Sequence, residues 1–245
     1  MRQYFSVFRY KRGIHSLIQH DSKGVSIREL LNDGQFVNEN VIELLREIFP
    51  NNPKVESEFK KGLLIYQDLL RNGNSNAPIS WNAGSNLCSF LYTYVKIAKP
   101  QLVIETGIAN GLTTLSILAG LKDSKGELHS FDIDSKTSTI GQVYPNWTWH
   151  KIAYSSPLKS FKKSLKNFKN VDLWIHDSDH SFFWQFNEYT LAQKTLSSDG
   201  ILVSDDIDFS RAWSKFRKNF SKSYILLDKY KFIGIARFKW NLIIL

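Results

Sequence analysis

Two short acidic segments, HDSDH (176–180) and SDD (204–206), contain residues that could do chemistry together. Each follows an apolar run typical of a buried parallel strand, and adjacent parallel strands end at the same edge of a sheet. Carboxylates gathered there repel one another unless a cation neutralises them. A hard divalent cation with oxygen ligands is the simplest neutraliser, so we predict an Mg²⁺ site shared by Asp177, Asp205 and Asp206. The alternative is that some of these aspartates cap the helices that follow.

His180 stands three residues after Asp177, within reach of the same carboxylates. A histidine there can take a proton near neutral pH, and a metal beside it would lower the pKa of the hydroxyl that gives up the proton. We therefore predict Asp177 and His180 as catalytic residues. The alternative is that His180 only begins the next helix and hydrogen-bonds Asp177. His176 precedes Asp177 in the strand and points to the opposite face, so we interpret it as structural.

A glycine-containing turn, ETGIANG (105–111), stands between an apolar run and a helix. Glycines let the backbone approach a ligand, and the first amides of a helix are free to bind it. The dinucleotide fingerprint G-x-G-x-x-G and the P-loop G-x-x-x-x-G-K-[ST] are both absent. Asp132 ends the next apolar run, 25 residues after Gly107, where it can accept hydrogen bonds from two ribose hydroxyls. Together they predict an adenosine-type ligand; alternatively, Asp132 only begins a loop with Asp134.

Strands that alternate with helices supply the elements to position these groups. Apolar runs predict strands at 101–106, 127–133, 147–152, 171–177 and 200–206. Helical periodicity predicts helices at 86–98, 111–121, 157–168, 181–197 and 209–219, the fourth closed by a turn at SSDG (197–200). The segments 223–228 and 231–238 are typical of an antiparallel hairpin. The pattern predicts an α/β fold, with a doubly wound, mostly parallel seven-stranded sheet and an antiparallel C-terminal hairpin.

The first 80 residues have a different pattern. Helical periodicity covers 39–49 and 54–71, and a polar, turn-rich stretch follows. These residues contain too little apolar pattern for a core of their own. We therefore predict a helical N-terminal cap or lid over residues 1–80 and a ligand-binding α/β domain over residues 81–245.

Taken in order, these motifs resemble the class I S-adenosylmethionine (SAM)-dependent methyltransferases. Within them, the closest resemblance is to the divalent-metal O-methyltransferases of the macrolide-sugar and cephalosporin-hydroxylase-like group. The stretches that carry the resemblance have that family's order and spacing: LVIETGIANGLTT (102–114), LHSFDID (128–134), VDLWIHDSDHSF (171–182) and DGILVSDDI (199–207).

The resemblance implies that SAM is the cofactor and that residues after the first, second and third strands line it. These are Glu105, Gly107, Ala109, Gly111, Thr113, Asp132, Tyr154 and Ser155. It also implies that Asp177, Asp205 and Asp206 are the metal carboxylates and His180 the general base. The sequence departs from the family at Ser178, where a glycine is usual.

Composition narrows the classes of protein. An apolar fraction of 42% over 245 residues excludes general disorder, and one cysteine, Cys88, excludes an internal disulfide framework. No apolar run approaches the ~18 residues of a membrane span, and the N-terminus lacks the apolar core of a secretory signal, so we expect a cytoplasmic protein. The net charge of +9 favours an anionic partner. However, the lysines of 159–169 have the spacing of a solvated amphipathic-helix face.

Together, the motifs and the resemblance imply a SAM-dependent methyltransferase that acts on a hydroxyl oxygen of a small molecule, a sugar or natural product, with Mg²⁺ and a histidine base. The alternatives are a metal-independent methyltransferase, a basic nucleic-acid-binding or modifying protein on the same fold, and a non-catalytic interaction protein. The apolar end NLIIL (241–245) indicates either a subunit contact in a homo-oligomer or a buried edge.

Overall fold

The computed structural model describes residues 37–38, 40–72, 78–229 and 231–239. Residues 1–36 of the predicted cap lie outside these ranges. The apolar end 241–245, for which a subunit contact was one of two predictions, also lies outside them. Within the described ranges, no helix is long and apolar enough to cross a membrane.

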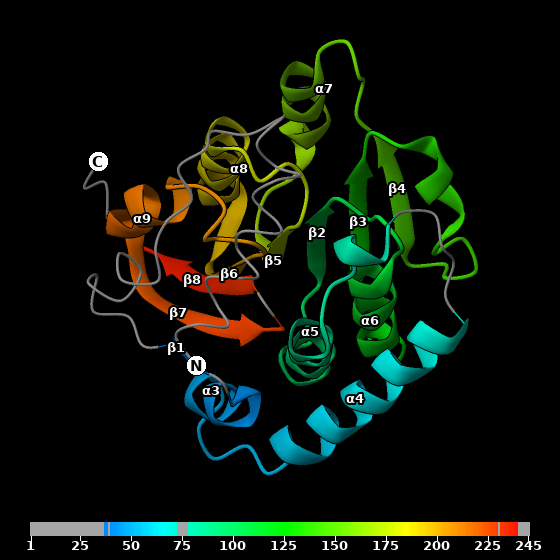
Figure 1. Cartoon of the computed structure of the whole chain (residues 1–245), viewed down its shortest axis with the longest axis vertical. Coiled ribbons are helices and arrows are strands. Elements are labelled where there is room, and N and C mark those ends of the chain that lie inside the picture. Colours follow the sequence, from blue (N-terminus) through cyan, green and yellow to red (C-terminus); the bar gives the residue numbers. More distant parts are fainter. Residues whose placement is uncertain (1–36, 39, 73–77, 230, 240–245) are drawn as a thin grey trace.

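One mixed sheet, in the order β1-β7-β8-β6-β5-β2-β3-β4, organises the chain (Figure 1). Its strands are β1 (Val37–Asn38), β2 (Leu102–Thr106), β3 (Glu127–Asp132), β4 (Trp147–Lys151), β5 (Val171–His176), β6 (Leu196–Ser204), β7 (Phe220–Asp228) and β8 (Lys231–Phe238). Only β8 runs antiparallel to its neighbours, β6 and β7, among the described strands. The predicted doubly wound, mostly parallel sheet with an antiparallel C-terminal hairpin is confirmed, and the two-residue β1 extends it beyond β7.

Helices cover both faces of this sheet. They are α3 (Val41–Ile48), α4 (Val55–Asn72), α5 (Ser85–Ala98), α6 (Leu112–Leu121), α7 (Pro157–Ser164), α8 (Phe182–Thr195) and α9 (Ala212–Phe216). Because side chains alternate along a strand, each strand contributes to two cores. In β5, Leu173 and Ile175 pack with the core under α5 and α6, whereas Trp174 packs with the core under α8 and α9.

The described helices of the predicted cap, α3 and α4, form an outer layer over α5 (Figure 1). The close approach depends on Gly62 of α4, since a Cβ there would lie 3.0 Å from the Cα of Ser89. The hydroxyl of Tyr92 on α5 donates a 3.3 Å hydrogen bond to Glu58 of α4. A lid function for residues 1–80 stays a prediction.

Two local predictions are wrong. The predicted turn at 197–200 is part of β6, which begins at Leu196. Val171 pairs with Leu196 and Leu173 with Ile201, so an irregularity in the β5–β6 pairing absorbs the extra residues. The helix predicted over 209–219 is reduced to α9 and a 3₁₀ turn, because the amide of Phe209 bonds the carbonyl of Asp206 in a separate turn.

Candidate active site

The glycine turn and the acidic segment after β5 are in direct contact. Gly107 follows β2 with a φ of 79°, in the left-handed region that favours glycine. A Cβ built on Gly107 would lie 2.0 Å from the carbonyl oxygen of Asp177. Ala109 and Gly111 also have positive φ, and Gly111 caps the start of α6. The predicted cofactor turn and the predicted catalytic segment therefore lie against one another.

Glu105 lies beneath this turn and is fully buried. Its carboxylate accepts hydrogen bonds of 2.6–2.7 Å from the hydroxyls of Thr113, Thr114 and Ser130. Burial raises the pKa of Glu105 to about 7, against the effect of these three donors. Glu105 and Thr113 thus tie β2 to α6 and β3 and support the turn. That either residue touches the cofactor stays a prediction.

Asp132, at the end of β3, is tied to the same turn. Its Oδ2 accepts a 2.9 Å hydrogen bond from the amide of Ile108, and its Oδ1 accepts a 2.8 Å hydrogen bond from the amide of Asp134. Burial raises the pKa of Asp132. Asp132 therefore begins a loop with Asp134, as the alternative interpretation expected, and it also lies beside the glycine turn. Its contact with ribose stays a prediction. Tyr154 and Ser155 are exposed after β4; their contact with adenine stays a prediction.

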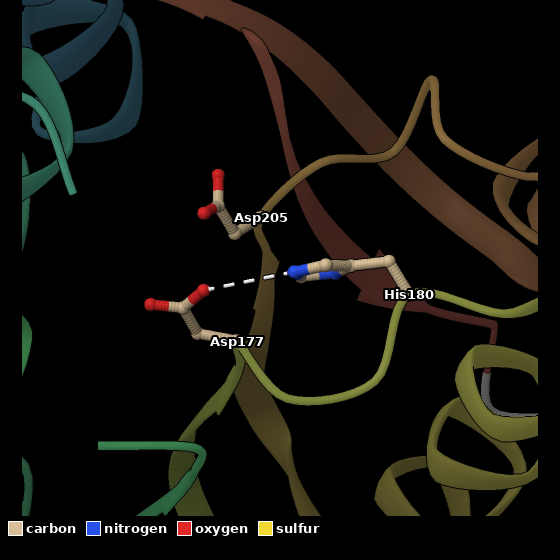
Figure 2. A group of neighbouring side chains, drawn as sticks. All are labelled: Asp177, His180 and Asp205. Atoms are coloured by element: carbon tan, nitrogen blue, oxygen red, sulfur yellow. Dashed lines mark ion pairs between the residues drawn. The ribbon is translucent and has the colours of Figure 1, made fainter. Parts of the chain in front are cut away.

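The structure brings Asp177, Asp205 and His180 together where β5 and β6 end (Figure 2). One ligand atom from each residue lies within 4.8 Å of the other two. Nε2 of His180 is 4.0 Å from Oδ1 of Asp177 and 3.5 Å from Oδ2 of Asp206. We call Asp177, Asp205, Asp206 and His180 the carboxylate cluster.

Lys231, the first residue of β8, is a member of this site that the sequence reasoning missed. Its ammonium pairs with Oδ2 of Asp205 and lies 4.0 Å from Oδ2 of Asp206. Burial alone would lower the pKa of Lys231. The neighbouring aspartates have the larger effect, so the pKa of the ammonium is raised. Antiparallel pairing of Ser204 with Gly234 explains the position, since it places the start of β8 at the end of β6.

The electrostatics of the cluster favour proton transfer. Burial lowers the pKa of His180, against the opposing effect of Asp206, so its neutral form is favoured. Burial and the neighbouring Asp205 raise the pKa of Asp177 well above its ordinary value. The cluster thus contains a neutral imidazole beside closely spaced carboxyl groups.

The same residues fit a divalent cation. Oδ1 of Asp205 is buried and has no hydrogen-bond partner among the described residues. Among the described residues, the ammonium of Lys231 pairs with Asp205 and lies 4.0 Å from Asp206, and Asp177 belongs to the same group of carboxyls. The group of three possible ligands contains His180 in place of the predicted Asp206, whose Oδ2 lies 3.5 Å from Nε2 of His180. Carboxylate oxygens suit Mg²⁺, while an imidazole nitrogen suits softer divalent ions.

A buried network beneath the cluster fixes the turn that carries it. Glu188 of α8 accepts hydrogen bonds from the hydroxyls of Thr106 (2.6 Å) and Ser178 (2.7 Å) and pairs with Nδ1 of His176 (2.7 Å). The indole Nε1 of Trp184 donates a 2.8 Å hydrogen bond to Ser178. Ser178 therefore anchors the turn to α8. His176 is fully buried in this network, and its ring lies 5.5 Å from that of His180, so the expectation that it points away from the site is wrong. Its structural role stays a prediction.

Comparisons with known proteins point to one kind of domain. Residues 104–207 match the family model of a methyltransferase domain. The chain is 20% identical over 137 residues to "O-methyltransferase hkm8" of Aspergillus hancockii, covering 54% of this chain and 53% of that protein. It thus spans about half the length of this curated relative.

Solved structures show the same fold at low sequence identity. SAH-bound methyltransferase PaMTH1 of Podospora anserina has a TM-score of 0.54 at 16% identity, covering 76% of this chain and 94% of that one. The O-methyltransferase of Bacillus cereus in complex with SAH has a TM-score of 0.51 at 12% identity, covering 81% and 97%. TomG of Streptomyces achromogenes in complex with SAM has a TM-score of 0.54 at 10% identity, covering 82% and 96%.

Proposed function

Because residues 104–207 match the family model of a methyltransferase domain, we propose that the protein transfers a methyl group from SAM to a hydroxyl oxygen of a small molecule, a sugar or natural product. The observation that carries the proposal is the contact between Gly107 and Asp177, which joins the glycine turn to the carboxylate cluster. The similarity to hkm8, an O-methyltransferase, and to TomG, an O-methyltransferase in complex with SAM, supports it.

In this proposal the cofactor lies along the turn from Gly107 to Gly111. The left-handed backbone at Gly107, Ala109 and Gly111 opens the start of α6 toward the ligand. Asp132 holds the ribose hydroxyls, and Tyr154 or Ser155 lies against the adenine. Asp132 is half-buried, and the amides of Ile108 and Asp134 hold its carboxylate in a fixed orientation. Both observations support its role in ribose binding.

The reaction is an in-line displacement. The acceptor oxygen must lie about 3 Å from the methyl carbon. The oxygen–carbon bond forms as the carbon–sulfur bond breaks, and the sulfonium becomes a neutral thioether. The acceptor proton passes to His180, which burial keeps neutral beforehand. The carboxylate of Asp206, whose Oδ2 is 3.5 Å from Nε2 of His180, stabilises the imidazolium that results.

A divalent cation, Mg²⁺, fits the oxygens of Asp177, Asp205 and Asp206 in this proposal and leaves His180 for the proton. When bound, the cation supplies a lowered pKa of the acceptor hydroxyl. The buried, unpartnered Oδ1 of Asp205 is the observation that supports it.

A metal-independent methyltransferase is the second candidate. The ammonium of Lys231 favours it, because this charge already neutralises one carboxylate of the cluster. Chelation distinguishes the two candidates: transfer that continues at full rate in EDTA favours the second.

The test combines SAM titration calorimetry with methyl transfer from labelled SAM to a panel of sugars and hydroxylated natural products. His180→Ala should keep the SAM affinity and lower transfer by about 10²–10⁴-fold. Asp179→Asn, an exposed carboxylate of the same turn, is the matched control and should behave as the wild type. Absence of SAM binding at millimolar concentration, or full transfer by His180→Ala, would contradict the proposal.

A further inference from the structure

Lys231 is held in place by the fold independently of the carboxylates it pairs with. Asp228, its partner across the β7–β8 hairpin, accepts hydrogen bonds from the amides of Gly84 (2.7 Å) and Asn86 (3.0 Å) at the start of α5. A Cβ on Gly84 would lie 2.1 Å from Oδ1 of Asp228, so this joint is closely packed. The end of the hairpin is therefore anchored, and its lysine is fixed at the edge of the site.

The lysine side chain has little access to water. It is 5% exposed, and the Asp205 side chain with which it pairs is fully buried. A buried ammonium needs charge partners, because an unpaired buried ion is strongly destabilising. Asp205 and Asp206 supply them, and both are among the residues proposed to hold the divalent cation.

A lysine and a divalent cation would therefore act on the same carboxylates. The ammonium occupies Oδ2 of Asp205 and leaves Oδ1 unpartnered among the described residues. It also reduces the negative charge that attracts a cation, and two positive charges a few ångströms apart repel one another strongly where water is excluded.

We propose that Lys231 is the resident counter-cation of the carboxylate cluster and that, by holding Oδ2 of Asp205, it weakens and thereby sets the affinity of the cluster for a divalent cation. The inference rests on the cation site of the proposed function. Lys231 stabilises the folded protein when the cation is absent, and the cation binds reversibly through the oxygens that remain.

The experiment compares Lys231→Met, which keeps the length and removes the charge, with the wild type. Calorimetric titration with MgCl₂ and with MnCl₂ should show at least about tenfold tighter binding to the variant. In EDTA the variant should melt at a lower temperature than the wild type, and saturating MnCl₂ should restore much of the difference.

Lys222→Met is the matched control. Lys222 lies on the adjacent strand β7, and its exposed ammonium is 3.4 Å from the exposed Glu47. This variant should bind both cations as the wild type does. Equal cation affinity in the wild type and Lys231→Met, or no cation binding to either at millimolar concentration, would overturn the inference.

A second variant covers the case in which Lys231→Met does not fold. Lys231→Met with Asp205→Asn removes both charges of the pair, so it should recover part of the melting temperature in EDTA. A double variant that is no more stable than Lys231→Met would overturn the counter-cation role. SAM titration of the wild type separates the two proposals, since lack of SAM binding contradicts the proposed function and leaves the cation result standing.

Discussion

Gly107→Ala tests the joint between the cofactor turn and the carboxylate cluster. An L-residue with a φ of 79° costs about 1–2 kcal/mol of strain. The added methyl would lie 2.0 Å from the carbonyl oxygen of Asp177 and 2.9 Å from the Cα of Ser178. These are backbone atoms, so no rotamer change relieves the overlap, and overpacking adds about 1–3 kcal/mol. The expected loss of unfolding free energy is therefore about 2–5 kcal/mol.

Gly111→Ala provides the matched control. Its φ is 78°, so the backbone strain is the same, but the added methyl would meet Cγ2 of Ile140, a side-chain atom that can move. Its expected cost is about 1–2 kcal/mol. The difference between the two variants isolates the backbone overlap at Gly107.

Urea unfolding measures both costs, and SAM titration with methyl-transfer assays measures the functional effect. Because relief of the overlap displaces Asp177, Gly107→Ala should lower the transfer rate by a larger factor than it lowers SAM affinity. If Gly107→Ala is as stable as Gly111→Ala and transfers methyl groups at the wild-type rate, the turn and the cluster are not mechanically joined.

Three further variants probe the supports of the site. Glu188→Ala leaves the buried His176 and Thr106 and the half-buried Ser178 without their common partner, so urea unfolding should show a loss of about 3–5 kcal/mol. A loss below about 1 kcal/mol would contradict the network. The folded pKa of Glu105, raised to about 7, lies above its unfolded value, so unfolding free energy should fall by up to about 3 kcal/mol as pH rises from 4.5 to 7. Glu105→Gln should lack this decrease in urea titrations at pH 5 and pH 8, and an unchanged pH dependence would refute the raised pKa. Asp132→Ala should weaken SAM binding at least about tenfold in calorimetry by removing the proposed ribose acceptor, and unchanged affinity would place the ribose elsewhere.

Much of the site was predictable because parallel strands impose its geometry. Asp177 and Asp205 each follow an apolar run, and right-handed crossovers bring the ends of β5 and β6 to the same edge. The juxtaposition of the two aspartates thus follows from strand order, whereas the turn that carries His180 is fixed by the contacts of Ser178 with α8. The glycine turn was also predictable from the sequence, because glycines between a strand and a helix are typical of a backbone with positive φ that approaches a ligand closely.

What the sequence did not predict depends on pairing across distant segments. Lys231 joins the cluster only because β8 inserts antiparallel beside β6, and a lysine at the start of a hairpin strand is ordinarily solvated. The burial of Glu105 beneath the turn likewise depends on three hydroxyls from α6 and β3 that no local pattern connects. Ser178 was recognised as a departure from the family, but its partner Glu188 lies a helix away.

A crystal structure of the complex with SAM would give the distance between the sulfonium methyl carbon and Nε2 of His180. With an acceptor oxygen between them, about 3 Å from each, that distance should be about 5–6 Å, with the ribose on Asp132. A cofactor bound away from Gly107 and Asp132, or a methyl group more than about 10 Å from His180, would contradict a single site for cofactor and proton transfer.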